Sequence, residues 1–255
     1  MSLFVGTSGY SYKEWKGNFY PDDLPDKEML KYYGTRLPTV EINNTFYRLP
    51  KESVLTTWAE QVPEQFRFSI KASQRITHIK RLKDAGNETE YLIRTVRALG
   101  AKLGVILFQL PPNLKKDLAR LEQFLKQIPG DVRAAFEFRH ASWFDDETFA
   151  LLHSNRSALC IADADDDLQI PFVSTADWGY FRLRREVYTK PALARWMKQI
   201  TEQSWGDAFV FFKHEDAGTG PKLAAKFLAL GNESSSSRNA PAKGKTRTKD
   251  TKRQA

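Results

Sequence analysis

Short β-type runs recur eight times along this chain, and helical patterns lie between most of them. The runs are Leu3–Val5, Thr39–Ile42, Phe66–Lys71, Leu103–Phe108, Val132–Phe138, Leu159–Ile161, Tyr180–Leu183 and Ala208–Phe212. Alternation of strands and helices at intervals of roughly 20 to 37 residues is typical of a parallel α/β sheet. Eight such units within 255 residues predict a single closed (β/α)8 barrel of the TIM type over residues 1–230.

The phosphate-binding motif of dinucleotide-binding Rossmann folds is absent, because no Gly-x-Gly-x-x-Gly follows the first run. Two helix starts are predicted from capping residues. Thr189, with Pro191 in the first turn, is expected to cap one helix. Asn87, with Glu90 three residues later, is expected to cap another.

The formal net charge of +8 is concentrated at the end of the chain. Residues 231–255 contain seven Lys or Arg residues against Glu233 and Asp250, and they include four consecutive serines but no aromatic residue. A segment of this composition cannot bury a core, so we expect a disordered basic tail. Weak contact with nucleic acid through phosphate charge and a purely solubilising role are both open for it.

No run of about 18 apolar residues occurs, so no membrane-spanning helix is expected. The first residues lack a secretory signal pattern, and the single cysteine, Cys160, lies in an apolar run and excludes an internal disulfide framework. These features predict a cytoplasmic protein with Cys160 as a buried strand residue.

Polar side chains gather where the predicted strands end. In a barrel these ends meet at one mouth, where enzymes of this fold keep their active sites. The residues expected there are Ser8, Glu41, Asn43, Lys71, Gln109, Glu137, Arg139, Asp163, Arg182 and Lys213. Asn43 and its neighbours Asn44 and Thr45 are also ordinary turn and capping residues.

Glu41 and Glu137 are the strongest catalytic candidates, because each is a carboxylate between apolar residues of a strand. With Lys71 beside them they could form an acid/base pair in which one carboxyl is protonated and the other ionised. The alternative is a structural ion-pair network that closes the top of the barrel. Lys71, Arg139 and Arg182 would hold anionic groups of a substrate, and Asn43 and Gln109 would orient it. Ser8 is a candidate for a hydrogen bond to the substrate.

Gly218-Thr-Gly-Pro-Lys222 follows the last strand and begins a helix. Gly218 and Gly220 could direct backbone N–H groups toward an anion, and Lys222 adds charge at the positive end of the helix. This position frequently binds phosphate in barrels, so the segment predicts phosphate binding.

Four aromatic residues are candidates for the wall of the site: Tyr10, Trp15, Tyr47 and Trp143. They could stack on a sugar or a base, and packing beneath long loops is the alternative.

No cofactor is predicted. The four histidines form no His-x-x-x-His or His-Glu-x-x-His pair. If a divalent metal were bound, His140 and His214 would be its histidine ligands, with carboxylates such as Asp163 and Asp216.

Four segments together resemble the YecE-like family, also called domain of unknown function 72. They are Gly6-Thr-Ser-Gly-Tyr-Ser-Tyr-Lys-Glu-Trp15, Glu41-Ile-Asn-Asn-Thr-Phe-Tyr47, Gln109-Leu-Pro-Pro112 and Glu137-Phe-Arg-His-Ala-Ser-Trp143. The resemblance implies a TIM-type barrel and no particular reaction. The chain departs from the common family pattern at Arg182-Leu-Arg184, where Arg-Leu-His-Gly is usual, and at Lys213-His-Glu-Asp216.

The leading hypothesis is an acid/base enzyme, a hydrolase or an isomerase, that acts on a phosphorylated or sugar-like substrate at the mouth of the barrel. The alternative is a non-catalytic nucleic-acid-binding module that uses the aromatic and basic rim together with the tail.

Overall fold

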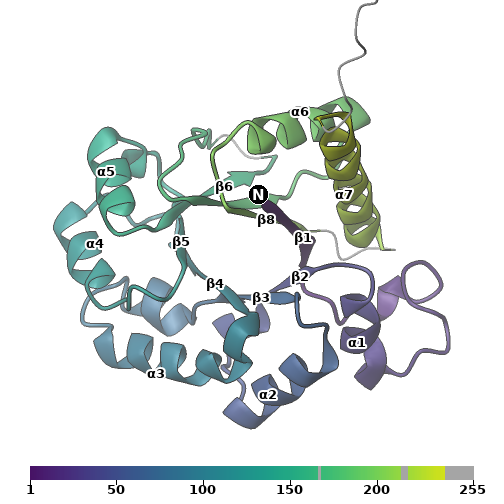
Figure 1. The fold of residues 1–255 in the computed structure, drawn as a ribbon. Helices are drawn as coiled ribbons and strands as arrows, with labels where there is room; N and C mark the ends of the chain where they lie inside the picture. The colour runs from purple at the N-terminus through teal and green to yellow at the C-terminus, as the bar shows by residue number, and fades with distance from the viewer. Residues whose placement is uncertain (166–167, 214–217, 239–255) are drawn as a thin grey trace, which may run out of the picture.

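The protein is an eight-stranded parallel barrel that closes by pairing its last strand with its first, as the sequence predicts (Figure 1). The computed structural model describes residues 1–165, 168–213 and 218–238. The strands are β1 (Ser2–Ser8), β2 (Thr39–Ile42), β3 (Arg67–Lys71), β4 (Leu103–Gln109), β5 (Ala134–Glu137), β6 (Ala158–Asp163), β7 (Trp178–Leu183) and β8 (Asp207–Phe212). Each strand pairs with its neighbours in sequence order, so all the strand ends named above lie on one side of the barrel.

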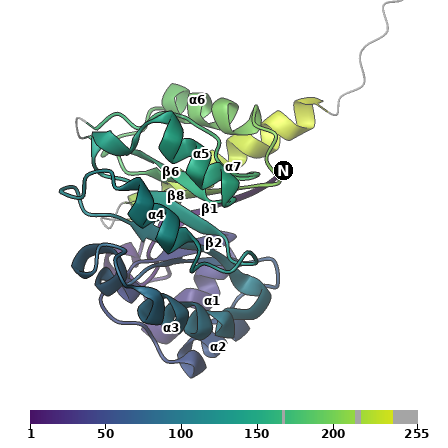
Figure 2. The same cartoon turned by 90° about the vertical axis from the view of Figure 1, so that its left-hand side faces the viewer.

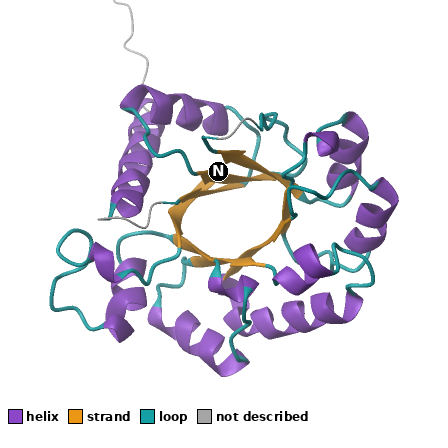
Figure 3. Ribbon diagram, turned by 180° about the vertical axis from the view of Figure 1, so that it is seen from behind, coloured by secondary structure: helices purple, strands orange, loops and turns teal. Residues whose placement is uncertain are grey.

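Helices form an outer ring around the strands, which Figure 3 shows in purple around an orange barrel. They are α1 (Met29–Gly34), α2 (Glu52–Gln61), α3 (Gly86–Val96), α4 (Leu118–Leu125), α5 (Asp146–Ser154), α6 (Lys190–Thr201) and α7 (Thr219–Arg238). Seen from the side, α6 and α7 lie at the opposite end of the molecule from α2 and α3 (Figure 2). None of the helices in the described ranges is long and apolar enough to cross a membrane.

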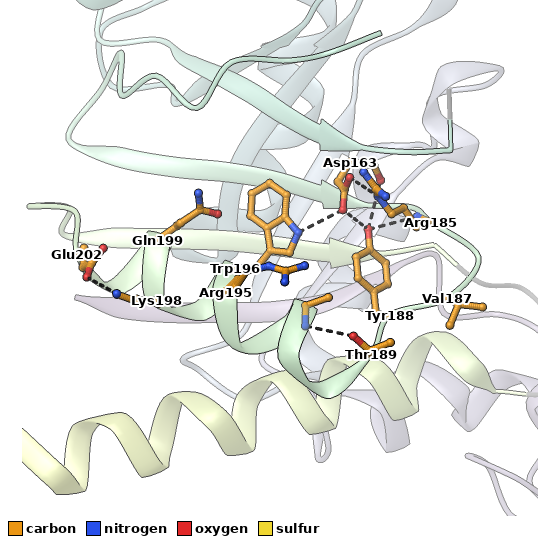
Figure 4. A pocket seen from close by; sticks show the side chains of 11 residues that line it. Asp163, Arg185, Val187, Tyr188, Thr189, Arg195, Trp196, Lys198, Gln199 and Glu202 are labelled. Carbon is orange, nitrogen blue, oxygen red and sulfur yellow. Dashed lines mark hydrogen bonds and ion pairs between the residues drawn. The ribbon is translucent and has the colours of Figure 1, made fainter. Parts of the chain in front are cut away.

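The connection between β6 and β7 contains no helix among its described residues. Aromatic side chains cover the sheet there instead: Phe172 lies 5.6 Å from Phe181 and 6.1 Å from Trp205 between ring centres. A cavity lies beside α6 and is lined by residues of α6, of the segment before it and by Asp163 of β6 (Figure 4).

The interior of the barrel has an apolar lower part and a polar upper part. Side chains alternate in direction along a strand, and the inward apolar ones form a separate cluster that includes Leu107, Cys160 and Phe209. Above them, the same alternation directs Ser8, Glu41, Lys71, Gln109, Glu137 and Arg182 inward. The strand pairing brings Ser8 opposite Glu41 and Gln109 opposite Glu137.

The segment after β3 has the least regular backbone in the described structure. A short π-helix runs over Arg75–Ile79. Three non-glycine residues with positive φ follow it: Arg81 (51°), Leu82 (67°) and Asp84 (50°). Such conformations are costly for side chains larger than glycine, and both features are frequent at functional sites.

The cap prediction at Thr189 is confirmed, since its side chain accepts a hydrogen bond from Ala192 N and Pro191 lies in the first turn. The prediction at Asn87 is wrong: α3 begins at Gly86, and its N-cap is Ala85, two residues before Asn87, with no side-chain hydrogen bond. The expected domain boundary at residue 230 falls within α7, which continues to Arg238. The rest of the expected tail, 239–255, lies outside the described residues.

Candidate functional site

One buried arginine joins the two glutamates that the sequence singled out. Arg182, near the end of β7, donates from Nη1 to Glu137 Oε2 at 2.7 Å and from Nη2 to Glu41 Oε1 at 2.8 Å. All three side chains are almost completely shielded from solvent. A guanidinium has a rigid fork of donors, so it can hold two carboxylates from opposite sides of the barrel in fixed positions.

Glu41 is surrounded by further donors. Its Oε1 accepts from Ser8 Oγ at 2.8 Å and from Asn43 Nδ2 at 3.2 Å, and its Oε2 accepts from the Tyr180 hydroxyl at 2.7 Å. Burial alone would raise the pKa of Glu41, but the charge of Arg182 and these hydrogen bonds hold it below its ordinary value. Glu41 is therefore a carboxylate at neutral pH.

Glu137 is also held in its ionised form. Its Oε1 accepts from Gln109 Nε2 at 2.9 Å and from Arg139 Nε at 2.9 Å. Burial opposes ionisation here too, but Arg182 and Arg139 lower the pKa of Glu137 far below its ordinary value. The expectation that one glutamate is protonated and the other ionised is wrong, because a cation lies between the two carboxylates. Their arrangement matches the structural alternative, an ion-pair network at the top of the barrel.

Lys71 places an amine at this mouth. Its Nζ lies 4.2 Å from the centre of the Phe46 ring, and in the described part of the chain its side chain makes no hydrogen bond or ion pair. Burial and then the charge of Arg182 lower the pKa of Lys71 to about 8, against the opposing effect of the glutamates. About a tenth of the Lys71 side chains are then neutral at pH 7.

Around Glu41 and Glu137, the described residues of the mouth carry more positive than negative charge. Three guanidiniums, Arg139, Arg182 and Arg184, lie within 4.0 Å of one or both of the two glutamates. Arg184 Nε and Asn43 Oδ1 are buried without a hydrogen-bond partner within the described structure. The surplus of positive charge and the Arg184 donor suit a small anionic ligand, and Asn43 Oδ1 is an acceptor for a hydroxyl group.

The structure adds residues that the sequence analysis did not select. Phe46 lies in a 3-10 turn directly after β2, and His78 lies in the π-helix after β3. The His78 and Phe46 rings meet edge to face with their centres 4.8 Å apart. From the sequence, Tyr180 cannot be told from a core aromatic residue. Its hydroxyl group reaches Glu41 only because of the way the barrel closes. His78 could have been noticed only as one of four histidines, just beyond a strand end.

The aromatic residues expected to wall the site are mostly elsewhere. Trp15 is fully buried, and Trp143 stacks on Phe138 with ring centres 4.6 Å apart and donates from its indole nitrogen to Leu114 O. Tyr10 packs against Trp58 outside the barrel. Only Tyr47 of the four is widely exposed, at 74%.

The predicted phosphate segment forms the start of α7. Gly218 has a φ of 74°, and a Cβ atom at this position would lie 3.3 Å from Asn18 Cβ in the loop after β1. The Lys222 ammonium donates to Asn18 Oδ1 at 3.2 Å. No contact joins Gly218, Gly220 or Lys222 to Glu41 or Glu137 among the interactions of the described residues. Phosphate binding by this segment stays a prediction.

Asp163 was expected at the mouth, but it lies on the outer face of β6 (Figure 4). Its carboxylate accepts from Arg185 Nε at 2.5 Å, from the Tyr188 hydroxyl at 3.0 Å and from Trp196 Nε1 at 3.2 Å. These residues line a cavity of about 480 Å³ beside α6. The reason is the strand alternation: Cys160 faces the barrel interior, so Asp163, three positions later, faces outward.

No cluster of three or more His, Cys, Asp or Glu side chains that could hold a metal occurs within the described ranges. His214 and Asp216, two of the ligands considered above, lie outside those ranges, as does the connection from Lys213 to Gly218. Lys213 directly follows β8, which ends at Phe212, and is partly buried.

Comparisons with known proteins agree with the resemblance. The UPF0759 protein YunF of Bacillus subtilis is 27% identical over 89% of this chain and 94% of its own length. The UPF0759 protein YecE of Escherichia coli K12 is 34% identical over 56% of this chain and 50% of its own length. A crystal structure of a DUF72 family protein from Thermotoga maritima superposes with a TM-score of 0.81 at 27% identity, over 90% of this chain and 99% of that one.

The family model described as "Protein of unknown function DUF72" matches residues 4–247, which is nearly the whole barrel and part of the C-terminal segment. The four sequence segments quoted above all lie within that match. The chain therefore belongs to the DUF72 family.

Proposed function

We propose that this protein is an enzyme that binds a small anionic substrate at the mouth of the barrel and transfers a proton with Lys71. The proposal is supported by two features that lie together at the mouth. Lys71 has no ion-pair partner in the described structure, and several guanidiniums surround the two glutamates. A purely structural lysine would be expected to pair with one of the two nearby carboxylates. Both of these are instead held by Arg182.

The reaction class that fits best is an isomerase-type proton transfer on a phosphorylated or carboxylated, sugar-like substrate. Hydrolysis by a pair of carboxyl groups needs one of them protonated as a general acid. The lowered pKa values of Glu41 and Glu137 disfavour that role for either residue. A general base works best when its pKa lies near the operating pH, and the pKa of Lys71 at about 8 meets that condition.

In this proposal the glutamates position Arg182 and set the charge around Lys71. Arg139 and Arg184 bind the anionic group of the substrate, and Asn43 Oδ1 accepts a hydrogen bond from a substrate hydroxyl. Nucleic-acid binding, the alternative, would use an aromatic surface. Trp15 and Trp143 are buried and contribute nothing to such a surface.

Two measurements on the full chain test the proposal. Thermal unfolding is followed with inorganic phosphate, sugar phosphates, oxo acids and short single-stranded oligonucleotides. A ligand at 100 times its dissociation constant should stabilise the fold by about 2.7 kcal/mol. Arg139→Met should raise the dissociation constant of the ligand at least tenfold and so reduce this stabilisation. Arg36→Met removes the same charge just before β2, at the opposite end of the barrel, and should leave it unchanged.

The second measurement follows exchange of the proton next to a carbonyl group in heavy water by NMR, for each ligand that stabilises the fold. Exchange should occur with the native protein and be lost in Lys71→Met, while binding of the ligand persists. The proposal fails if no small anion stabilises the protein, if Arg139→Met binds as well as the native chain, or if stabilisation comes from oligonucleotides alone.

A further inference from the structure

The surroundings of Lys71 suit an amine that reacts and not only one that accepts a proton. Its nitrogen lies on the face of Phe46, is partly shielded from water and has no acceptor within the described residues. The nearest charged groups include the Arg182 guanidinium, which favours the neutral amine. Lysines that attack carbonyl groups are activated in this way, by desolvation or by a neighbouring cation.

Phe46 and the two glutamates would stabilise the product of such an attack, against the opposing charge of Arg182. An iminium ion is cationic, and the face of an aromatic ring attracts a cation by about 0.5–2 kcal/mol. Phe46 lies at the right distance for this contact, since Nζ is 4.2 Å from its ring centre. The carboxylates of Glu41 and Glu137 add a favourable long-range field for positive charge at Nζ.

A proton-transfer group also packs on the ring that Lys71 contacts. The His78 and Phe46 rings meet edge to face, so Lys71 and His78 contact the same aromatic side chain. His78 Nδ1 pairs with the Thr77 hydroxyl at 2.9 Å, which fixes the ring and leaves its other nitrogen for exchange with solvent or substrate. The π-helix and the positive-φ residues that follow hold His78 in this place, and the Lys80–Glu88 pair at 2.7 Å ties that segment to α3.

We propose that Lys71 forms a Schiff base with the carbonyl carbon of a small anionic aldehyde or ketone, with His78 as the proton-transfer partner. This inference rests on the proposed function, because it assumes that the mouth binds the anionic group through Arg139 and Arg184. It narrows the substrate class to carbonyl compounds that carry a carboxylate or a phosphate.

The chemical steps balance without any further reactant. The neutral amine of Lys71 attacks the carbonyl carbon, a C–N bond forms and the C=O π bond breaks. A proton moves from nitrogen to oxygen to give the carbinolamine. The imidazolium form of His78 then gives a proton to the hydroxyl group, so that the C–O bond breaks, water leaves and an iminium ion remains beside a neutral imidazole. The positive charge of the iminium acidifies the neighbouring C–H group, and the neutral His78 accepts that proton.

The test traps the iminium ion by reduction with borohydride in the full chain. Glyoxylate and pyruvate serve as carboxylate probes, glyceraldehyde 3-phosphate as a phosphate probe, and propanal as an uncharged control. Hydride addition makes a stable secondary amine, so the protein gains the mass of the probe less one oxygen atom. Peptide mapping locates the adduct. Comparison of the carboxylate probes with the phosphate probe tells which anionic group the site prefers.

We expect at least tenfold more adduct on Lys71 than on any other lysine with an anionic probe, and at least tenfold less with propanal. Inorganic phosphate should protect Lys71. Lys71→Arg keeps the charge but should give no adduct at the site, and its fold is checked by near-ultraviolet circular dichroism. His78→Gln should slow adduct formation about tenfold or more without changing its location. The matched control, His153→Gln on α5, should not alter the rate.

Adducts spread evenly over surface lysines, or equal with propanal, would overturn the inference. So would protection of Lys71 that does not depend on Arg139. If heavy-water exchange depends on Lys71 while no adduct can be trapped, the Schiff base is wrong and the proposed function stands. If no small anion binds at all, both are wrong.

Discussion

Replacement of Arg182 by methionine would remove the only buried cation that bridges Glu41 and Glu137 in the described structure. The two ion pairs measure 2.8 and 2.7 Å, and none of the three side chains is more than 3% exposed. When one partner of a buried ion pair is removed, the remaining charge is left uncompensated, which costs about 3–5 kcal/mol. The free energy of unfolding of an ordinary domain is about 5–15 kcal/mol. Arg182→Met should therefore still fold, but with much of its stability lost.

The pH dependence should also reverse, and the sign follows from the direction of the pKa shifts. In the native protein both glutamates have lowered folded-state pKa values. The stability that the two glutamates contribute is therefore present above their unfolded-state pKa of about 4.3. It is lost as the pH falls through their lower folded-state pKa values. In Arg182→Met, burial dominates for Glu41 and raises its folded-state pKa. Its contribution is then present below about pH 4.3 and is lost as the pH rises through the raised value.

The assay is urea unfolding followed by tryptophan fluorescence between pH 5 and pH 8. Arg182→Met should be less stable than the native chain throughout, and its deficit should grow toward pH 8. Adding Glu41→Gln to Arg182→Met removes the uncompensated charge, so the double variant should regain about 1–2 kcal/mol at pH 8 and lose the pH slope. A deficit under about 1 kcal/mol, or a slope parallel to that of the native chain, would refute this account of the network.

Three further predictions use the same unfolding and labelling methods. Lys71→Met should stabilise the fold by about 0.5–2 kcal/mol at pH 7, because the Lys71 pKa falls to about 8 on folding from about 10.4 in the unfolded chain. This gain in stability should shrink by pH 10, and a gain that persists at pH 10 would contradict the lowered pKa. Gly6→Ala places a Cβ atom 1.9 Å from Thr39 O and should cost about 3 kcal/mol, whereas Gly130→Ala meets nothing within 4 Å and should stay within about 0.5 kcal/mol; equal melting temperatures would disprove the close strand approach. Burial raises the pKa of the Cys160 thiol well above its usual range, so a disulfide reagent at pH 8 should modify it only as the protein unfolds, and rapid labelling of the native state would show that this strand is open to solvent.

The barrel and the two glutamates could be predicted because they follow from local rules. Apolar runs at regular intervals set the strands, and a carboxylate such as Glu41 inside an apolar run needs a buried partner. The partner arrangement could not be predicted, because it depends on how far each strand is staggered when the barrel closes. Only then does Arg182 reach both carboxylates and keep both ionised.

The aromatic residues show a different limit of the sequence. Trp15 and Trp143 each end a short 3-10 helix in the connection after a strand. A large ring there can either face solvent or cover the core, and local sequence patterns are the same in both cases. Their burial comes from tertiary contacts, such as the stacking of Trp143 on Phe138. Phe46 and His78 were missed for the opposite reason: each is an ordinary residue that gains a role only through what lies beside it.

The bridge from Arg182 has a consequence for synthesis on the ribosome. The chain emerges from its N-terminus, so β2 and β5 are available well before β7 supplies the arginine. Until then Glu41 and Glu137 lack the cation that pairs with both of them. A partial barrel on the ribosome must therefore leave the two carboxylates hydrated and the mouth of the barrel open. We therefore expect the first six strands to assemble only loosely during translation, and the compact barrel to form once β7 has left the exit tunnel.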